Sequence, residues 1–156
     1  MVERGRPKGL MKLFLRFPIL LYRAGLGELF GQRFLLLTHT GRKSGKPRQA
    51  VVEVMRHDDA TDAYVAAAAW GENSDWFRNI KKGPSVQITV GRATSRRLAE
   101  VLAPAAGGEE FLRYAQRHPT AFRALTRTLT GETLAATPDA CRTLGETVPV
   151  VAFLRT

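Results

Sequence analysis

Apolar and polar residues follow strand-like patterns along much of the chain after residue 32. Residues 33–40 (RFLLLTHT) form a short apolar run that suits a buried strand, and residues 49–56 (QAVVEVMR) alternate between the two faces of a strand. The same patterns predict further strands over residues 63–69, 85–90, 94–102 and 148–154. We therefore expect six strands, joined mostly by hairpins.

Glycine, proline and polar residues separate these strands. Residues 41–47 (GRKSGKP) are predicted as a loop, residues 57–62 (HDDATD) as a hairpin turn, and Gly91-Arg92 as another turn. Ser74 is placed to cap a short helix that Gly83-Pro84 would end. The hairpins therefore favour antiparallel pairing.

Helical patterns lie toward both ends of the chain. Residues 8–22 are amphipathic, with a kink or break expected at Pro18, and residues 109–116 and 120–129 are predicted as helices separated by His118-Pro119. Residues 131–147 show no clear pattern. Because strands and helices do not alternate as βαβ units would, we expect an α+β fold, a mostly antiparallel six-stranded barrel with flanking helices.

The length of 156 residues favours a single domain over residues 1–156. Within it, residues 1–30 would form the N-terminal helical segment and residues 33–156 the barrel with its C-terminal helices. Hydrophobic residues make up 44% and charged residues 24%, which excludes a wholly disordered, collagenous or coiled-coil chain. The single cysteine, Cys141, excludes an internal disulfide and favours a reducing, cytoplasmic setting.

The apolar stretch within residues 13–22 is too short for a spanning helix, and Arg16 and Pro18 interrupt it. A secretory signal is not expected, because no cleavage site of small residues follows. An amphipathic helix here would suit either the surface of a membrane or one side of the domain.

Positive charge is concentrated near the start of the chain. The formal net charge is +10, and residues 1–48 contain 11 lysines and arginines against 2 acidic residues. Such a concentration indicates an anionic partner: nucleic acid, membrane headgroups or a phosphorylated small molecule. A solvated basic surface without a ligand is the alternative.

The segment Gly41 to Arg48 (GRKSGKPR) has four cations and two glycines directly after a predicted buried strand. Backbone N–H groups and cationic side chains can converge there on one anion, as in a phosphate-binding nest. It is not a Walker A loop, since its glycines are separated by three residues and a strand follows. A basic hairpin tip that contacts nothing is the other reading.

Four consecutive alanines, residues 66–69, precede Trp70-Gly71. Alanine is depleted in strands because it offers little to pack. The run therefore predicts the close approach of something large, either a planar ring system or a protein side chain such as Trp76 or Phe77.

Conventional catalytic groups are scarce. His39, His57 and His118 are far apart in the sequence, neither HExxH nor GxSxG occurs, and Cys141 is interpreted as a small apolar residue. If the chain is an enzyme, we expect a bound cofactor to supply the reactive atoms. No metal site is expected.

Two segments together resemble a known family. Residues 35–48 (LLLTHTGRKSGKPR) and residues 69–91 (AWGENSDWFRNIKKGPSVQITVG) resemble the deazaflavin-dependent oxidoreductases, the nitroreductase-type proteins built on a split β-barrel of the FMN-binding type. FPILLYRAGLGELFG and the terminal VPVVAFL also fit, so the resemblance covers most of the chain.

The resemblance implies coenzyme F420, a deazaflavin with a polyanionic phosphate and oligoglutamate tail. Lys43 and Arg48 would hold the phosphate, with Arg42, Ser44 and Gly45 shaping the loop and Lys46 near the tail. The small Ala67 and Ala68 would let the deazaflavin ring lie close to the strand. Trp76 and Asn79 would secure the following helix against the coenzyme site. The implied coenzyme-binding residues are Arg42, Lys43, Ser44, Gly45, Lys46, Arg48, Ala67, Ala68, Trp76 and Asn79.

The implied reaction passes hydride from reduced F420 to an electrophile such as a quinone, an enone or a nitro compound. Residues 117–127 (RHPTAFRALTR) lack the tyrosines that nitroreductase members place there, which makes nitroimidazole activation doubtful. The substrate wall is predicted to include Tyr22, Trp70, Tyr114 and His118.

Several alternatives stay open from the sequence. The chain could be a non-catalytic carrier of F420 or of a fatty acid, or an FMN-binding protein of the same fold. Nucleic-acid binding is not expected, because the strands flanking the basic loop offer no aromatic stacking platform. The sequence does not fix the oligomeric state.

Overall fold

The computed structural model describes residues 33–156 and the isolated position 19. The helix expected over residues 8–22, and Tyr22 with it, lies outside the described residues. Whether residues 1–156 form a single domain stays a prediction. Within the described part of the chain, no helix is long and apolar enough to cross a membrane.

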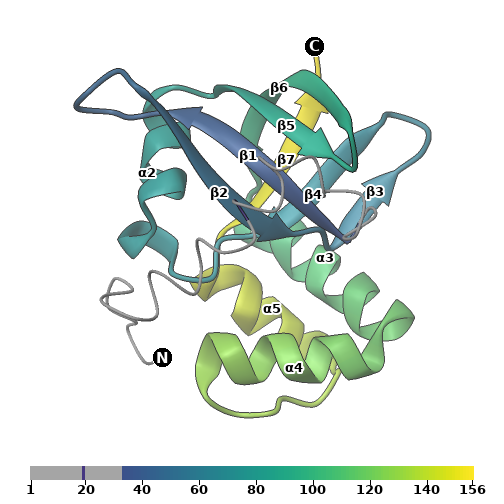
Figure 1. The fold of residues 1–156 in the computed structure, drawn as a ribbon. Coiled ribbons are helices and arrows are strands. Elements are labelled where there is room, and N and C mark those ends of the chain that lie inside the picture. Colours follow the sequence, from purple (N-terminus) through teal and green to yellow (C-terminus); the bar gives the residue numbers. More distant parts are fainter. Residues whose placement is uncertain (1–18, 20–32) are drawn as a thin grey trace.

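Seven antiparallel strands form one sheet, which curls into a half-barrel (Figure 1). Its order is β2-β1-β5-β6-β7-β4-β3. The expected fold class, an α+β split barrel, is confirmed. The strands are β1 (Phe34–Thr40), β2 (Pro47–Glu53), β3 (Arg56–Asp58), β4 (Ala63–Ala67), β5 (Ser85–Val90), β6 (Ala93–Val101) and β7 (Val150–Arg155).

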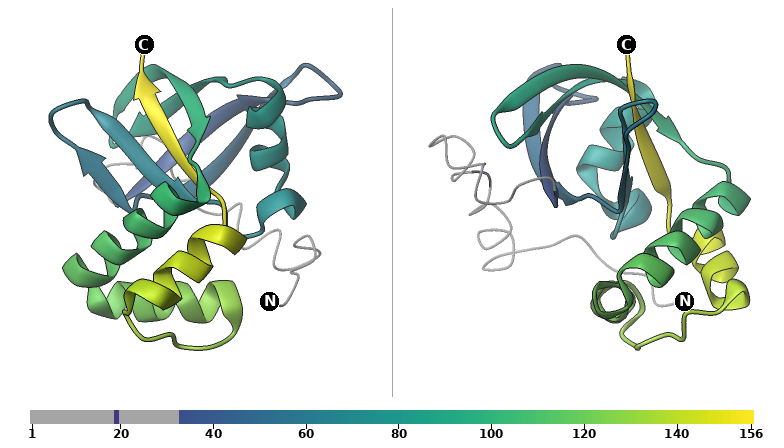
Figure 2. Two further views of the ribbon diagram at one scale, coloured as in Figure 1. Left: turned by 180° about the vertical axis from the view of Figure 1, so that it is seen from behind. Right: turned by 90° about the vertical axis from the view of Figure 1, so that its right-hand side faces the viewer.

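The helices lie in two places (Figure 2). One packs against β1 and β2 on one side of the barrel, after a 3-10 turn η2 (Gly71–Asn73), while the other three gather below one end of the sheet. These helices are α2 (Asp75–Lys82) in the first position, and α3 (Pro104–Arg117), α4 (Pro119–Thr130) and α5 (Pro138–Thr147) in the second.

The expected number of six strands is wrong, because the polar segment after Met55 begins with strand β3 and not with a turn. His57 pairs with Tyr64 of β4 in register, and their rings stack with centroids 4.2 Å apart. Polar side chains are tolerated here because they are paired: Arg56 donates to both carboxylate oxygens of Glu110 on α3, at 2.8 and 2.9 Å. A strand held together by tertiary ion pairs has no apolar alternation to reveal it.

The helices also differ from expectation in three details. Ser74 occupies the N-cap position of α2, but its side chain makes no capping hydrogen bond. Helix α3 begins at Pro104, five residues earlier than expected, and includes Gly107 and Gly108. Helix α5 was not predicted; Thr137 caps it by accepting from the N–H of Ala140 at 3.2 Å.

Two apolar clusters hold these layers together. The first fills the curled sheet and includes Leu35, Ile88 and Phe153 together with Phe77 of α2. The second lies between the sheet and α3 to α5, with Phe111 and Phe122 at its centre. Because α2 joins the first cluster, it is fixed directly behind the β1–β2 hairpin.

Candidate functional site

The loop between β1 and β2 has a closely defined backbone. The N–H of Gly41 donates to the Lys46 carbonyl at 2.8 Å, and the N–H of Gly45 donates to the Gly41 carbonyl at 2.9 Å. Gly45 has a φ of +68°, and a Cβ on Gly41 would lie 2.5 Å from Ser44 Oγ. Glycine is therefore needed at position 45, whereas a larger residue at position 41 would require the Ser44 side chain to rotate away.

Arg42 points inward and ties the loop to α2. Its backbone N–H donates to Asn79 Oδ1 at 3.0 Å, and its Nη1 donates to the same oxygen at 2.9 Å. The guanidinium also lies 3.3 Å from Asp75 Oδ1, and Lys82 Nζ donates to the Arg42 carbonyl at 2.9 Å. Arg42 therefore acts as a scaffold for the loop.

Three other cations of the loop remain available. Lys43, Lys46 and Arg48 are exposed, and within residues 33–156 none of them forms an ion pair. Ser44 Oγ accepts from the Lys46 N–H at 3.2 Å, which keeps the tip of the loop compact. A rigid loop with three unneutralised cations fits a polyanionic ligand such as a phosphate with a carboxylate tail.

His39 supports this loop from inside the barrel. It is buried, and its Nδ1 lies 3.0 Å from Asn79 Nδ2. Burial lowers the pKa of His39 to about 4, Asp75 opposes that shift, and Arg48 adds to it. At neutral pH the ring is therefore uncharged, so Nδ1 can accept from the amide and leave Asn79 Oδ1 facing Arg42.

Sequence reasoning missed the roles of His39, Asp75 and Lys82. For His39 a signal existed: Leu35, Leu37 and His39 share the inward face of β1, so the two-residue period placed the imidazole in the barrel. For Asp75 and Lys82 no such signal existed, because their contacts depend on how α2 packs behind the hairpin.

The side chains of the four consecutive alanines point alternately to two opposite sides of the chain. Ala66 and Ala68 are fully buried in the cluster that contains Phe77, so a protein side chain accounts for them. Ala67 and Ala69 face the opposite side and line a cavity. Of the predicted pair Ala67 and Ala68, only Ala67 is open to a ligand.

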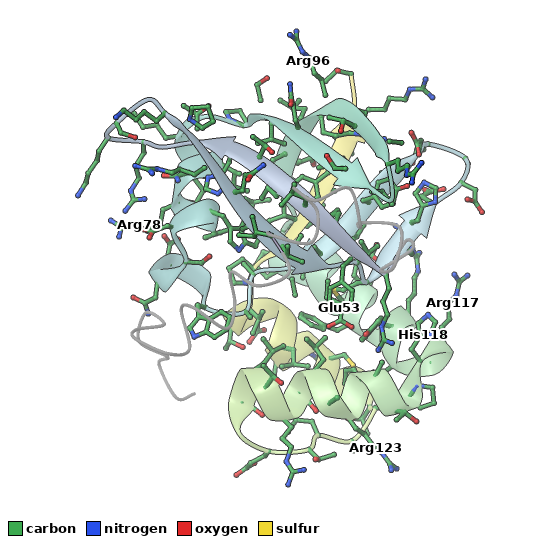
Figure 3. The ribbon with its side chains drawn as sticks, viewed as in Figure 1. Glu53, Arg78, Arg96, Arg117, His118 and Arg123 are labelled. Carbon is green, nitrogen blue, oxygen red and sulfur yellow. The ribbon has the colours of Figure 1, made fainter. Side chains whose placement is uncertain are left out.

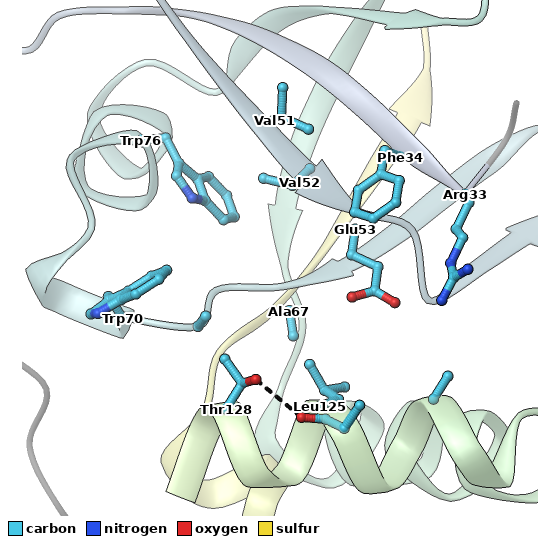
Figure 4. A pocket seen from close by; sticks show the side chains of 13 residues that line it. Arg33, Phe34, Val51, Val52, Glu53, Ala67, Trp70, Trp76, Leu125 and Thr128 are labelled. Carbon is cyan, nitrogen blue, oxygen red and sulfur yellow. Dashed lines mark hydrogen bonds between the residues drawn. The ribbon is translucent and has the colours of Figure 1, made fainter. Parts of the chain in front are cut away.

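That cavity, the tryptophan cavity, has a volume of about 280 Å³. Figure 4 shows Trp70 and Trp76 on one side, Phe34 and Glu53 on the other, and Leu125 and Thr128 of α4 below. Trp76 is held by ring contacts with Phe77 and Phe153, at centroid distances of 6.1 and 6.5 Å. The walls of the tryptophan cavity are mostly apolar, as expected for a site that takes a planar ring.

A second cavity of about 780 Å³, the arginine cavity, lies between β2, β3 and the α3–α4 junction. Tyr114 and His118 line it, with ring centroids 5.5 Å apart. Tyr114 Oη donates to Glu53 Oε1 at 2.9 Å, and burial, together with the charge of Glu53, raises the pKa of Tyr114 well above its ordinary value. The two cavities share Arg33, Glu53, Ala121 and Ala124 as lining residues.

Apart from Ala68, which is buried in the first apolar cluster, and Tyr22, which lies outside the described residues, the predicted site residues fall into three places. The six loop residues lie together at the hairpin beside Asn79, whereas Trp70, Trp76 and Ala67 lie at the tryptophan cavity. Tyr114 and His118 lie at the arginine cavity. Among the described residues, no group of three His, Cys, Asp or Glu side chains could hold a metal ion.

Comparison with solved structures agrees with this architecture. The structure of an F420-H2 dependent reductase (FDR-A) matches with a TM-score of 0.54 and 20% identity, covering 79% of this chain and 95% of the other. A protein of unknown function from Agrobacterium tumefaciens, Atu2129, matches with a TM-score of 0.56 and 17% identity, over 90% and 55% of the two chains. At these identities the likeness concerns the fold.

Sequence comparison gives the family. A Mycobacterium tuberculosis protein whose name assigns it to the F420H(2)-dependent quinone reductases, Rv3178, is 39% identical over 59 residues. That alignment covers 36% of this chain and 48% of the relative, so the chain spans about half the length of the curated relative it matches. The family model for F420H(2)-dependent quinone reductase matches residues 21–131, which is more than half of the chain. The chain therefore belongs to the F420H(2)-dependent quinone reductases, an oxidoreductase family whose coenzyme is F420.

Proposed function

We propose that this chain binds reduced F420 and reduces a quinone or another electrophile of similar size, such as an enone or a nitro compound. The observation that carries the proposal is the hairpin loop, where Lys43, Lys46 and Arg48 are exposed and unneutralised on a backbone that α2 holds in place. The loop is continuous with β2, and Val51, Val52 and Glu53 of β2 line the tryptophan cavity. One strand thus connects the phosphate cradle to a cavity suited to a ring.

The residues have separate tasks in this proposal. Lys43 and Arg48 bind the phosphate, Lys46 binds near the acidic tail, and Asn79 keeps Arg42 from turning outward. Trp70 and Trp76 orient the deazaflavin ring and exclude water from its face. When bound, the reduced coenzyme supplies the hydride. The proton that the reduced acceptor needs comes from solvent or from a residue at the cavity wall.

Binding is the first test. F420 is titrated into the 156-residue chain, with FMN titrated under the same salt conditions as a rival phosphate-bearing ring. Lys43→Ala with Arg48→Ala should weaken F420 binding by about 100-fold or more, because two charge-assisted hydrogen bonds worth roughly 1.5–3 kcal/mol each are lost. The matched control is Arg123→Ala with Arg127→Ala, which removes two exposed cations of α4 that line neither cavity.

The second test is turnover. Oxidation of reduced F420 is followed optically with a quinone, an enone and a nitro compound in separate reactions. Acceptor-dependent oxidation supports the reductase. Binding of F420 without turnover by any acceptor would instead make the chain a carrier, and the absence of F420 binding by the unmutated chain would overturn the proposal.

A further inference from the structure

The arginine cavity has a charge distribution that the reduction of a neutral quinone does not explain. Four arginines line it, Arg33, Arg56, Arg113 and Arg117, whereas Glu53 is the only carboxylate among the described lining residues. These cations do not all have the same surroundings, and the difference shows which of them can reach a ligand.

Two of the arginines are engaged in the protein. Arg56 donates to both oxygens of Glu110 and lies 3.6 Å from Asp58 Oδ2, and Arg113 lies 3.6 Å from Glu110 Oε1. His57 is also engaged, at 2.8 Å from Asp62 and 3.3 Å from Asp59. These groups form a wall that is already neutralised.

Arg33 and Arg117 differ from Arg56 and Arg113. Both are exposed, and neither forms an ion pair with any residue in the described range. His118 beside Arg117 is exposed as well and makes no side-chain cap for α4. Figure 3 shows Arg117 and His118 at the α3–α4 junction and Glu53 pointing from the sheet toward these helices. Arg117 therefore leaves positive charge at one end of the cavity, beside the exposed ring of His118.

The other end of the cavity suits the reacting part of a ligand. Glu53 is occupied on Oε1 by the hydroxyl of Tyr114. Val54, Met55, Ala121 and Ala124 supply apolar walls, and the last two also line the tryptophan cavity. A ligand with an apolar ring and an anionic group can therefore place the ring toward the tryptophan cavity and the anion near Arg117.

We infer that the arginine cavity is the acceptor site and that it selects acceptors in which a flat apolar ring carries a carboxylate or a similar anionic group. This rests on the proposed function for the redox step, but the binding preference itself needs no coenzyme. An arginine side chain without a protein partner gains a charge-assisted hydrogen bond from such a group and gains none from a neutral ring.

The experiment uses two probes of nearly equal size, 2-naphthoate and the neutral 2-naphthamide. Each is titrated into the 156-residue chain without coenzyme, by calorimetry or by NMR shift mapping. The naphthoate should bind about tenfold or more tightly than the naphthamide, and Arg117→Gln should reduce that ratio to about 1 to 3. Arg33 also lines the tryptophan cavity and lies over the Phe34 ring, so Arg33→Gln should reduce the ratio less than Arg117→Gln does. Arg123→Gln, on an exposed α4 position outside both cavities, should preserve the ratio.

Equal affinity for the two probes, or an unchanged ratio in the Arg117→Gln variant, would overturn the inference. An F420 titration of the same variants separates this result from the proposed function. Arg117→Gln should leave F420 affinity within about twofold, whereas Lys43→Ala with Arg48→Ala should weaken F420 binding and leave the naphthoate preference intact. A chain that prefers naphthoate but binds no F420 would retain the anion site and lose the reductase assignment.

Discussion

The imidazole Nδ1 of His39 lies 3.0 Å from the side-chain nitrogen of Asn79, and this buried contact joins β1 to α2 behind the cationic loop. The other end of the same amide accepts two hydrogen bonds from Arg42. Asn79 is thus the link through which the barrel interior fixes a loop at its surface.

Replacing Asn79 with alanine should both destabilise the fold and loosen the loop. Two Arg42 donors lose their acceptor and His39 loses its partner, so we expect the free energy of unfolding to fall by about 2 kcal/mol. F420 affinity should fall about tenfold even under conditions where the variant is fully folded. Urea denaturation and a coenzyme titration measure the two effects.

Lys81→Ala is the control for this change. Lys81 lies on the same helix, exposed, and pairs with Glu72 instead of the loop. It should change stability by less than about 1 kcal/mol and leave binding unaffected. Asn79→Ala with normal F420 affinity would show that Arg42 is held by Asp75 and Lys82 alone.

Burial of His39 predicts a specific dependence of stability on pH. Its pKa in the fold is about 4, below the ordinary 6.5, so the folded state favours the neutral ring. The contribution of the neutral His39 ring to the free energy of unfolding is therefore fully present above about pH 6.5 and is lost as the pH falls from there toward 4. Over that window the contribution amounts to roughly 3 kcal/mol.

His39→Gln should flatten this part of the pH profile, measured by urea unfolding at pH 7, 5.5 and 4.5. Glutamine keeps a hydrogen-bonding side chain but cannot titrate. Arg123→Gln, at an exposed position of α4, should leave the profile as it is in the unmodified chain. An identical slope in the unmodified chain and His39→Gln would mean that other groups govern stability in this range.

The sequence predicted the ends of elements correctly where local patterns match the tertiary structure. Gly83-Pro84 ends α2 and His118-Pro119 separates α3 from α4, as backbone chemistry requires. The glycines of the basic loop were correctly placed in a hairpin, and its cations do lie together. Their role in binding F420 stays a prediction.

The features that the sequence did not predict depend on contacts between distant segments. Strand β3 is polar and is stabilised by Glu110 from α3, and α5 lies within the stretch of residues 131–147 that shows no clear periodicity. The sequence resemblance assigned Arg42 to shaping the loop, but its inward contacts with Asn79 were not predicted. Four cations in eight residues look equivalent in a sequence, and only the packing of α2 turns one of them inward.

The Arg56–Glu110 pair should contribute measurably to stability, unlike the exposed pairs of this protein. Its side chains are 22% and 9% exposed, and the contact is bidentate. A double-mutant cycle with Arg56→Ala and Glu110→Ala should give a coupling energy of about 1.5–3 kcal/mol. The exposed pair Arg142–Asp139 provides the comparison, with an expected coupling below about 0.5 kcal/mol. Equal coupling in the two cycles would contradict the idea that β3 depends on this pair.

The crossing of α3 and α5 depends on glycine at position 145. A Cβ there would lie 2.4 Å from both the Gly108 nitrogen and the Pro104 carbonyl oxygen, and these backbone atoms cannot move without shifting α3. Gly145→Ala should therefore lower the free energy of unfolding by about 1–3 kcal/mol despite the better helix propensity of alanine. Urea denaturation monitored by circular dichroism gives the value.

Glu146→Ala, at the next and exposed position of α5, is the matched control and should change stability by less than about 0.5 kcal/mol. The basic loop is held by Asn79, Asp75 and Lys82 of α2, so it does not depend on this helix crossing. Folded Gly145→Ala should accordingly bind F420 as the unmodified chain does, while unfolding at lower urea. A variant as stable as the unmodified chain would mean that α3 and α5 can separate at little cost, and the arginine cavity, whose wall includes the end of α3, would then be adjustable in shape.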